Sequence, residues 1–270
     1  MSVANRYPTG WTPAVLGMVA ICGYGLWLLL GLGLALGVYS SGRGDALVPL
    51  LLGAVAVSLG PLLASLRLPC LRGWCGWRIE PGGFPSRPAL LALICYLPAL
   101  GVAGLVQGDD DFWATRLISA ALAACSVVCL VCVWRKRRAP AAVGPVGPVG
   151  LFRLERVIAA GFGGGLWLLF CVLSQDPSVR ATGGHVRIIG LLLLILLLGL
   201  AEGMHWQSMG RAGAPGHWRT RFVSMALTYV IPCASLLLHA FRDGRWPVLV
   251  AACAFLLGRS IEWRLRESMP

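Results

Sequence analysis

The sequence has few charged residues and very little acid. Charged side chains make up 13% of the 270 residues, about half the share of an ordinary soluble domain, and only 11 residues are Asp or Glu. Hydrophobic residues reach 57%, and the mean hydropathy is +0.76. These values are typical of a membrane protein. The net charge of +12 therefore indicates basic loops that set membrane topology, and nucleic acid is excluded as a partner.

Histidine and lysine are too few for two classes of cofactor-binding membrane protein. A bis-histidine haem needs histidines that face each other within the bundle. Of the four histidines, two lie in expected loops, and His205 and His239 lie near span ends on opposite faces. A retinal Schiff base needs a lysine within a span, and the one lysine, Lys136, lies in a loop. The sequence therefore argues against the haem class and excludes the retinal class.

The cysteines and clustered glycines are interpreted as packing residues. Most of the ten cysteines lie inside apolar runs and form no disulfide framework. Cys125, Cys129 and Cys132 share a helix face, but a metal site would need thiolates, which a membrane core disfavours. The glycines at 161 and 163–165 lie in a helical run with no preceding strand, which indicates close helix packing.

Apolar runs of about the 20 residues that a membrane helix needs occur eight times. Their approximate bounds are 12–39, 46–66, 88–106, 115–134, 155–174, 187–206, 221–240 and 246–263. The first run is longer than the apolar part of a signal peptide. We therefore expect an all-α integral membrane protein, a helical bundle of eight transmembrane helices that forms a single domain over 1–270.

The basic residues predict the orientation. Eight spans place both termini on one side, and that side carries 16 basic residues against 6 on the other, with Arg259 inside the last span left out. By the positive-inside rule, both termini are expected in the cytoplasm. The run 135–138 is expected to anchor the topology and to contact anionic lipid.

Two pairs of ionisable residues lie at span ends, where charge is costly and often functional. Glu202 and His205 are three residues apart near the end of the sixth run, and Arg259 and Glu262 are three apart in the eighth. Both pairs are expected on the cytoplasmic side. One pair could transfer protons, or it could be an ion pair that ties the last helix to the bundle.

Three stretches carry a family resemblance. Segment 62–100, LLASLRLPCLRGWCGWRIEPGGFPSRPALLALICYLPAL, resembles the segment that joins the second and third helices in membrane anchor subunits of the dimethyl sulfoxide reductase family. The residues it shares with that pattern, in order, are Leu68, Arg72, Trp74, Trp77, Arg78, Ser86 and Arg87. Segment 202–211 with 230–232 resembles the family's Tyr-Trp-Arg helix end and the Leu-Pro helix that follows. Segment 258–267, GRSIEWRLRE, resembles its C-terminal Glu-Arg-Trp-Leu signature.

The resemblance implies a role in a redox complex. Such anchors hold an iron–sulfur ferredoxin-like subunit and a molybdopterin catalytic subunit on the bacterial cytoplasmic membrane. They exchange electrons with quinone and bind no cofactor of their own. Together with the expected topology, this favours the branch with cytoplasmic catalytic subunits, of the sulfite dehydrogenase type.

This chain departs from the family at the proton-handling positions. Arg67 replaces the family's His, Pro69 its Gly, and Pro88 its Glu. A guanidinium cannot accept a quinol proton, so other groups must do so. The expected quinone-binding residues are Arg67, Glu80, Glu202 and His205.

The same loop is the expected docking surface. Arginine and tryptophan dominate many protein interfaces, and the residues expected to bind the partner subunits are Arg72, Trp74, Trp77, Arg78 and Arg87. Lipid phosphate is the other expected contact for these arginines. Two alternative functions remain open, a small multi-pass transporter and a membrane scaffold without a redox role.

Overall fold

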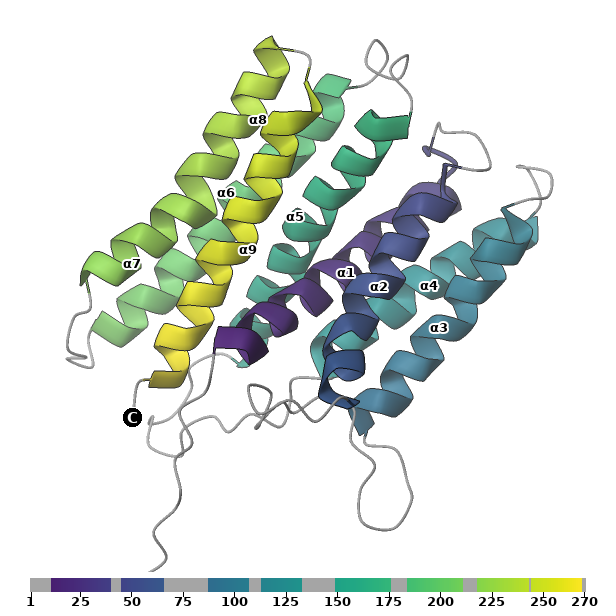
Figure 1. Ribbon diagram of the computed structural model, residues 1–270, viewed down its shortest axis with the longest axis horizontal. Helices are drawn as coiled ribbons and strands as arrows, with labels where there is room; N and C mark the ends of the chain where they lie inside the picture. The colour runs from purple at the N-terminus through teal and green to yellow at the C-terminus, as the bar shows by residue number, and fades with distance from the viewer. Residues whose placement is uncertain are drawn as a thin grey trace, which may run out of the picture.

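The protein is a bundle of helices (Figure 1). The structure, a computed structural model, describes residues 11–39, 45–65, 87–106, 113–132, 149–175, 184–210, 218–242 and 244–268, and none of these residues lies in a strand. The helices are α1 (Trp11–Ala35), α2 (Leu47–Ser65), α3 (Arg87–Leu105), α4 (Trp113–Cys132), α5 (Val149–Gln175), α6 (Gly184–Gly210), α7 (Trp218–Met225), the π-helix η3 (Ala226–Val230), α8 (Ile231–Phe241) and α9 (Arg245–Ser268). Each of the eight expected apolar segments is therefore helical, and the seventh is divided into α7, η3 and α8.

Consecutive segments alternate in direction along the bundle (Figure 1). The start of α1 and the end of α9 lie at the same end of it. There the guanidinium carbon of Arg264 lies 4.3 Å from the ring centroid of Trp11, a cation–π contact. Short connections favour antiparallel neighbours, as between α3 and α4, α5 and α6, and α6 and α7.

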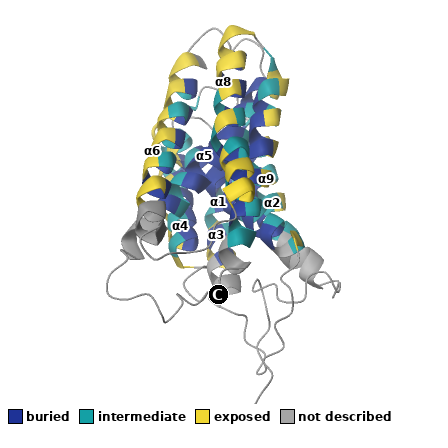
Figure 2. Ribbon diagram, turned by 90° about the vertical axis from the view of Figure 1, so that its left-hand side faces the viewer, coloured by how far each residue is buried: buried dark blue, intermediate teal, exposed yellow. Residues whose placement is uncertain are grey.

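Among the described residues, five helices are long and apolar enough to cross a membrane. They are Ala14–Ala35, Trp113–Cys132, Leu154–Gln175, His185–Met204 and Trp218–Phe241. The apolar parts of α2 and α3 are shorter, Leu47–Leu59 and Ala92–Leu105. Exposed residues lie on the outer faces of helices such as α6 and α8 (Figure 2). On α6 they include Leu193, Leu196 and Leu200, each more than half exposed, as suits a lipid-facing surface. The protein is a multi-pass, all-helical membrane protein.

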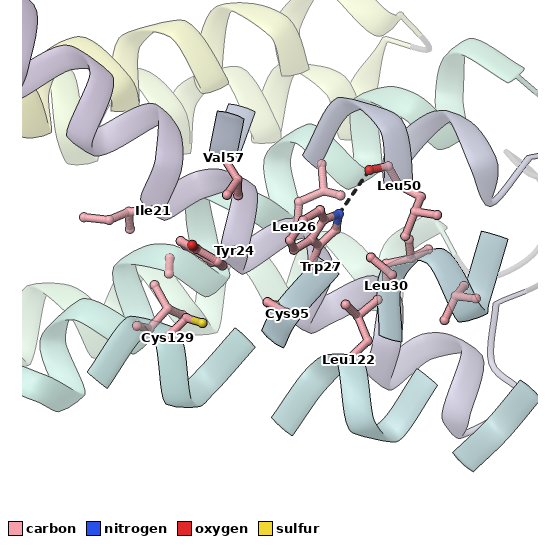
Figure 3. Close-up of a cluster of buried hydrophobic side chains, with 14 of the residues drawn as sticks. Ile21, Tyr24, Leu26, Trp27, Leu30, Leu50, Val57, Cys95, Leu122 and Cys129 are labelled. Atoms are coloured by element: carbon pink, nitrogen blue, oxygen red, sulfur yellow. Dashed lines mark hydrogen bonds between the residues drawn. The ribbon is translucent and has the colours of Figure 1, made fainter. Parts of the chain in front are cut away.

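The centre of the bundle is α1, which packs against α2, α4, α5 and α9. Its Trp27 is fully buried, and its indole Nε1 donates a hydrogen bond to the Leu50 carbonyl of α2 at 3.0 Å (Figure 3). Tyr96 of α3 meets the Trp27 ring edge-on, with 5.2 Å between centroids. A buried indole that finds a backbone acceptor adds a specific contact to apolar packing, so Trp27 fixes the register of α1 against α2.

Glycine allows α1 to approach α5 at backbone distance. A Cβ added at Gly25 would lie 1.8 Å from the Ala160 carbonyl oxygen, and one added at Gly164 would lie 2.2 Å from the Gly25 carbonyl carbon. Gly163 and Gly165 are also crowded, against Cys22 and Leu191 respectively. The packing interpretation of 163–165 is confirmed, because small residues allow membrane helices to pack closely.

The cysteine face of α4 is only partly a packing face. Cys129 is buried, Cys125 is half-buried and Cys132 is exposed. All eight described cysteines are free thiols. On α3, the Cys95 thiol lies 3.6 Å from the Ser126 hydroxyl of α4. Cys95 and Cys129 both belong to the apolar cluster around Trp27 (Figure 3), where cysteine serves as a small hydrophobe.

Candidate functional site: a buried glutamate–arginine cluster

Arg259 of α9 lies at the centre of a buried ionic cluster. Its Nη2 lies 2.8 Å from Oε1 of Glu155 on α5, and its Nη1 lies 3.0 Å from Oε2 of Glu202 on α6. Nη1 also donates a hydrogen bond to Oε2 of Glu262, one turn further along α9. All four side chains are at least 90% buried. One guanidinium therefore joins three helices inside the bundle.

The alternation of the helices brings these residues to one level. Glu155 lies near the start of α5, Glu202 near the end of α6, and Arg259 near the end of α9. Because α5 runs opposite to both α6 and α9, its start lies beside their ends (Figure 1). The three-residue spacing of Arg259 and Glu262 puts them on the same face of their helix. The helix order thus assembles a cluster from positions 104 residues apart.

A tyrosine of the seventh segment also contacts the cluster. The Tyr229 hydroxyl, in η3, donates a hydrogen bond to Oε2 of Glu202. The same oxygen accepts the bond from Arg259 Nη1. The Tyr229 ring passes close to Gly199 of α6, where an added Cβ would lie 3.5 Å from its Cε1. Glu202 is therefore held between a cation and a phenol, whereas Tyr229 itself is only half-buried.

Three carboxylates in one buried site interact strongly. One ligand oxygen from each of Glu155, Glu202 and Glu262 lies within 4.8 Å of the others. Like charges so close repel one another more strongly in a low-dielectric interior than in water, and each carboxylate gains from a nearby cation or from taking up a proton. Carboxylate oxygens are also the ligands that hard cations prefer. The arrangement can exchange protons, and the three oxygens could hold a metal ion.

The structure brings together some of the predicted site residues. Glu202, predicted as a quinone-binding residue, is in the cluster, together with both members of the Arg259–Glu262 pair. The ion pairs of Arg259 with Glu155 and Glu202 tie α9 to α5 and α6. His205 follows on α6, but its side chain lies outside the described residues, as does that of Arg87 at the start of α3. The remaining predicted residues, Arg67, Arg72, Trp74, Trp77, Arg78 and Glu80, lie in the segment 66–86, outside the described residues.

Sequence reasoning missed Glu155 and Tyr229. Glu155 stands at the beginning of the fifth apolar run and is not among the expected site residues. An acidic residue in a chain with only 11 of them, at the edge of a span, is a signal that could have found it. Tyr229 gives no such signal, because a tyrosine in an apolar run is ordinary.

Comparisons with protein-family models, with curated proteins and with solved structures find no match for this chain.

Proposed function

We propose that the chain is the membrane anchor subunit of a molybdenum and iron–sulfur oxidoreductase complex that exchanges electrons with quinone, and that the glutamate–arginine cluster exchanges the protons that accompany quinol oxidation and its reverse. The proposal joins the family resemblance of the sequence to the geometry of the cluster. In it the iron–sulfur clusters and the molybdopterin belong to the partner subunits.

The observation that carries this proposal is the meeting of two resembling stretches at one site. The stretch 202–211 contributes Glu202, and the stretch 258–267 contributes Arg259 and Glu262. These segments lie more than 50 residues apart in sequence, yet Arg259 contacts Glu202 at 3.0 Å. Tyr229 directly precedes 230–232, the other part of the second resembling stretch, and its hydroxyl donates a hydrogen bond to the same carboxylate. Residues from two of the three resembling stretches are thus grouped around buried acid.

The chemistry of quinol oxidation needs such a group. Removing two electrons from a quinol also releases two protons, which a base within reach must accept. A carboxylate can serve as that base, whereas Arg67, at the family's usual position, cannot. Glu202 is our first candidate in the described bundle, and Glu80 is the candidate in the loop.

The proposed assembly also defines the membrane arrangement. We propose eight spans in a bacterial cytoplasmic membrane, with both termini inside. The iron–sulfur and molybdopterin subunits would dock on the cytoplasmic loop that contains Trp74 and Arg78. The sign of the loop charges supports this orientation.

The test is purification from native membranes through a tag on this chain. We expect an iron–sulfur subunit and a molybdopterin subunit to co-purify, and the complex to oxidise a short-chain quinol analogue. Glu202→Gln should lower that rate at least tenfold while the subunits still co-purify. Glu80→Gln is the matched variant in the loop, and a loss confined to it would move the proton acceptor there. A chain that purifies without redox partners would overturn the proposal.

A second candidate function is proton- or cation-coupled transport. It is favoured by the three carboxylates whose oxygens lie within 4.8 Å of one another, because intramembrane acids mark ion and proton pathways. The chain alone, reconstituted in liposomes, would then move protons or a cation down an imposed gradient. Glu202→Gln should abolish this movement. No flux above that of empty liposomes would exclude the transporter.

A further inference from the structure

The seventh segment contains a π-turn at the level of the cluster. The residues that flank η3 are helical, with φ −63° and ψ −43° at Met225 and φ −65° and ψ −47° at Ile231. The helix therefore continues through η3 with one wider turn instead of breaking. Such single π-turns within α-helices occur frequently at functional sites.

At the π-turn, the consecutive side chains of Thr228 and Tyr229 contact two different helices. On one side, the Ser224 hydroxyl donates to the Gly258 carbonyl of α9 at 2.8 Å. Thr228 also lies against Gly258, where an added Cβ would be 2.4 Å from its Oγ1. The next residue, Tyr229, reaches Glu202 on α6.

A regular α-helix would place these residues differently. At 3.6 residues per turn, Tyr229 would be rotated about 140° from Ser224. The π-turn closes on the fifth residue instead of the fourth, which brings Tyr229 back toward the face of Ser224. Tyr229 can then reach Glu202, which its ion pair with Arg259 holds beside α9, while Ser224 and Thr228 keep their contacts with Gly258 of α9. The lack of a side chain at Gly258 makes room for this arrangement.

Tyr229 also connects the buried cluster to the outside of the bundle. Glu202 is 4% exposed, whereas Tyr229 is half-buried. Exposed residues follow it in sequence and lie on α6: Val230 is 64% exposed, and Leu200 and Met204 of α6 are more than half exposed. An added Cβ at Gly203 would meet nothing within 4 Å. Tyr229 is thus the one side chain among those described in the cluster that is not fully buried.

We infer that Tyr229, held by the π-turn, is the proton relay between Glu202 and a quinol at the lipid-facing edge between α6 and η3. This inference rests on the proposed function for the identity of the proton donor. In the relay, the O–H bond of a quinol breaks and its proton bonds to Tyr229 Oη. At the same time the Tyr229 proton bonds to the Glu202 carboxylate, so that the tyrosine ends neutral. The second proton repeats the relay after Glu202 has passed the first to Glu155 or Glu262, whose oxygens lie within 4.8 Å of its own, and both electrons pass to the iron–sulfur subunit.

The first test uses the chain alone in lipid nanodiscs. After a pH jump, infrared spectroscopy follows the protonated-carboxyl C=O band that Glu202→Gln removes. Tyr229→Phe should slow the appearance of that band at least tenfold and leave its final amplitude close to that of the wild type. Tyr96→Phe is the control, because Tyr96 is also a half-buried membrane tyrosine, bonded to Ser58 and to the Ala54 carbonyl far from the cluster. Equal rates in wild type and Tyr229→Phe would overturn the inference, and so would equal slowing by Tyr96→Phe.

The second test addresses the rotational position that the π-turn gives to Tyr229. Inserting one alanine between Thr228 and Tyr229 turns Tyr229 by about 100° relative to Ser224 and Thr228, away from Glu202. We expect this insertion to slow protonation as much as Tyr229→Phe does. An unchanged protonation rate would show that the position of Tyr229 on its helix does not matter for the relay.

The third test uses the purified complex and a short-chain quinol analogue. Tyr229→Phe should lower kcat at least tenfold and change KM little, because a relay acts on proton transfer. If Glu202→Gln abolishes oxidation while Tyr229→Phe leaves it intact, the relay is wrong and the proposed function stands. If no redox partner co-purifies, the proposed function fails, and the nanodisc measurement still decides whether Tyr229 serves Glu202.

Discussion

Arg259 and Glu155 form an ion pair of 2.8 Å that joins the last helix to α5 across 104 residues of sequence. Both side chains are more than 90% buried. A buried charge pair is costly to assemble, and removing one partner is costlier still, because the other charge stays behind without compensation. The cluster therefore couples the stability of α9 to the protonation of three glutamates on α5, α6 and α9.

Arg259→Met should destabilise the protein by about 3–5 kcal/mol, the cost of leaving buried charge uncompensated. The measurement is thermal or denaturant unfolding in detergent. The same change combined with Glu155→Gln, Glu202→Gln and Glu262→Gln should recover most of the loss, because the repelling charges are then gone. If the combined variant is no more stable than Arg259→Met, the loss does not arise from the carboxylates.

Gly25→Ala should destabilise the protein by about 1–3 kcal/mol or more, the usual cost of overpacking, because the added Cβ would lie 1.8 Å from the Ala160 carbonyl oxygen. Gly190→Ala is the matched control on α6, where an added Cβ meets nothing within 4 Å. The control should be neutral or stabilising by about 0.5–1 kcal/mol, because alanine favours a helix over glycine. Unfolding of both variants in the same detergent measures the difference. Equal stability would contradict the close crossing of α1 and α5.

Reporter fusions should place the C-terminus and a site near Pro145 in the cytoplasm. The reason is the excess of 16 basic residues over 6 on that side of the expected topology, since Lys and Arg keep short loops inside. Paired reporters that are active only in the cytoplasm or only in the periplasm provide the measurement. A periplasmic C-terminus would contradict both the orientation and the cytoplasmic position of the proposed partners.

Trp74→Ala combined with Arg78→Ala should release the partner subunits from membranes and leave the abundance of this chain unchanged. An aromatic ring and a bidentate guanidinium dominate many interfaces. The same double change at Arg137 and Arg138 should release much less, because an unbroken run of charge is suited to lipid phosphate. Membrane co-fractionation measures the release. Equal retention in both double variants would show that the loop binds lipid and not a partner.

Local sequence patterns are enough to predict the class of the protein and the order of its helices. Apolar runs of about the length of a membrane helix are visible residue by residue, and each of the eight expected segments contains a helix. Among the described residues, five of these helices are long and apolar enough to cross a membrane. The spacing of Arg259 and Glu262 also predicted a pair on one helix face, because helical neighbours recur every three to four residues. The glycines at 163–165 predicted a close crossing for a similar local reason, the absence of side chains.

Which helices meet depends on the packing of the bundle and is not visible in local sequence patterns. Nothing in the sequence near Glu155 indicates Arg259 as its partner, because that contact depends on how α5 and α9 pack around α1. The π-turn is equally invisible in the sequence, since 226–230 reads as an ordinary apolar helix and its extra width depends on contacts with Gly258. A pattern of residues determines local helix and burial, whereas a cluster of charges from three helices depends on the packing of the whole bundle.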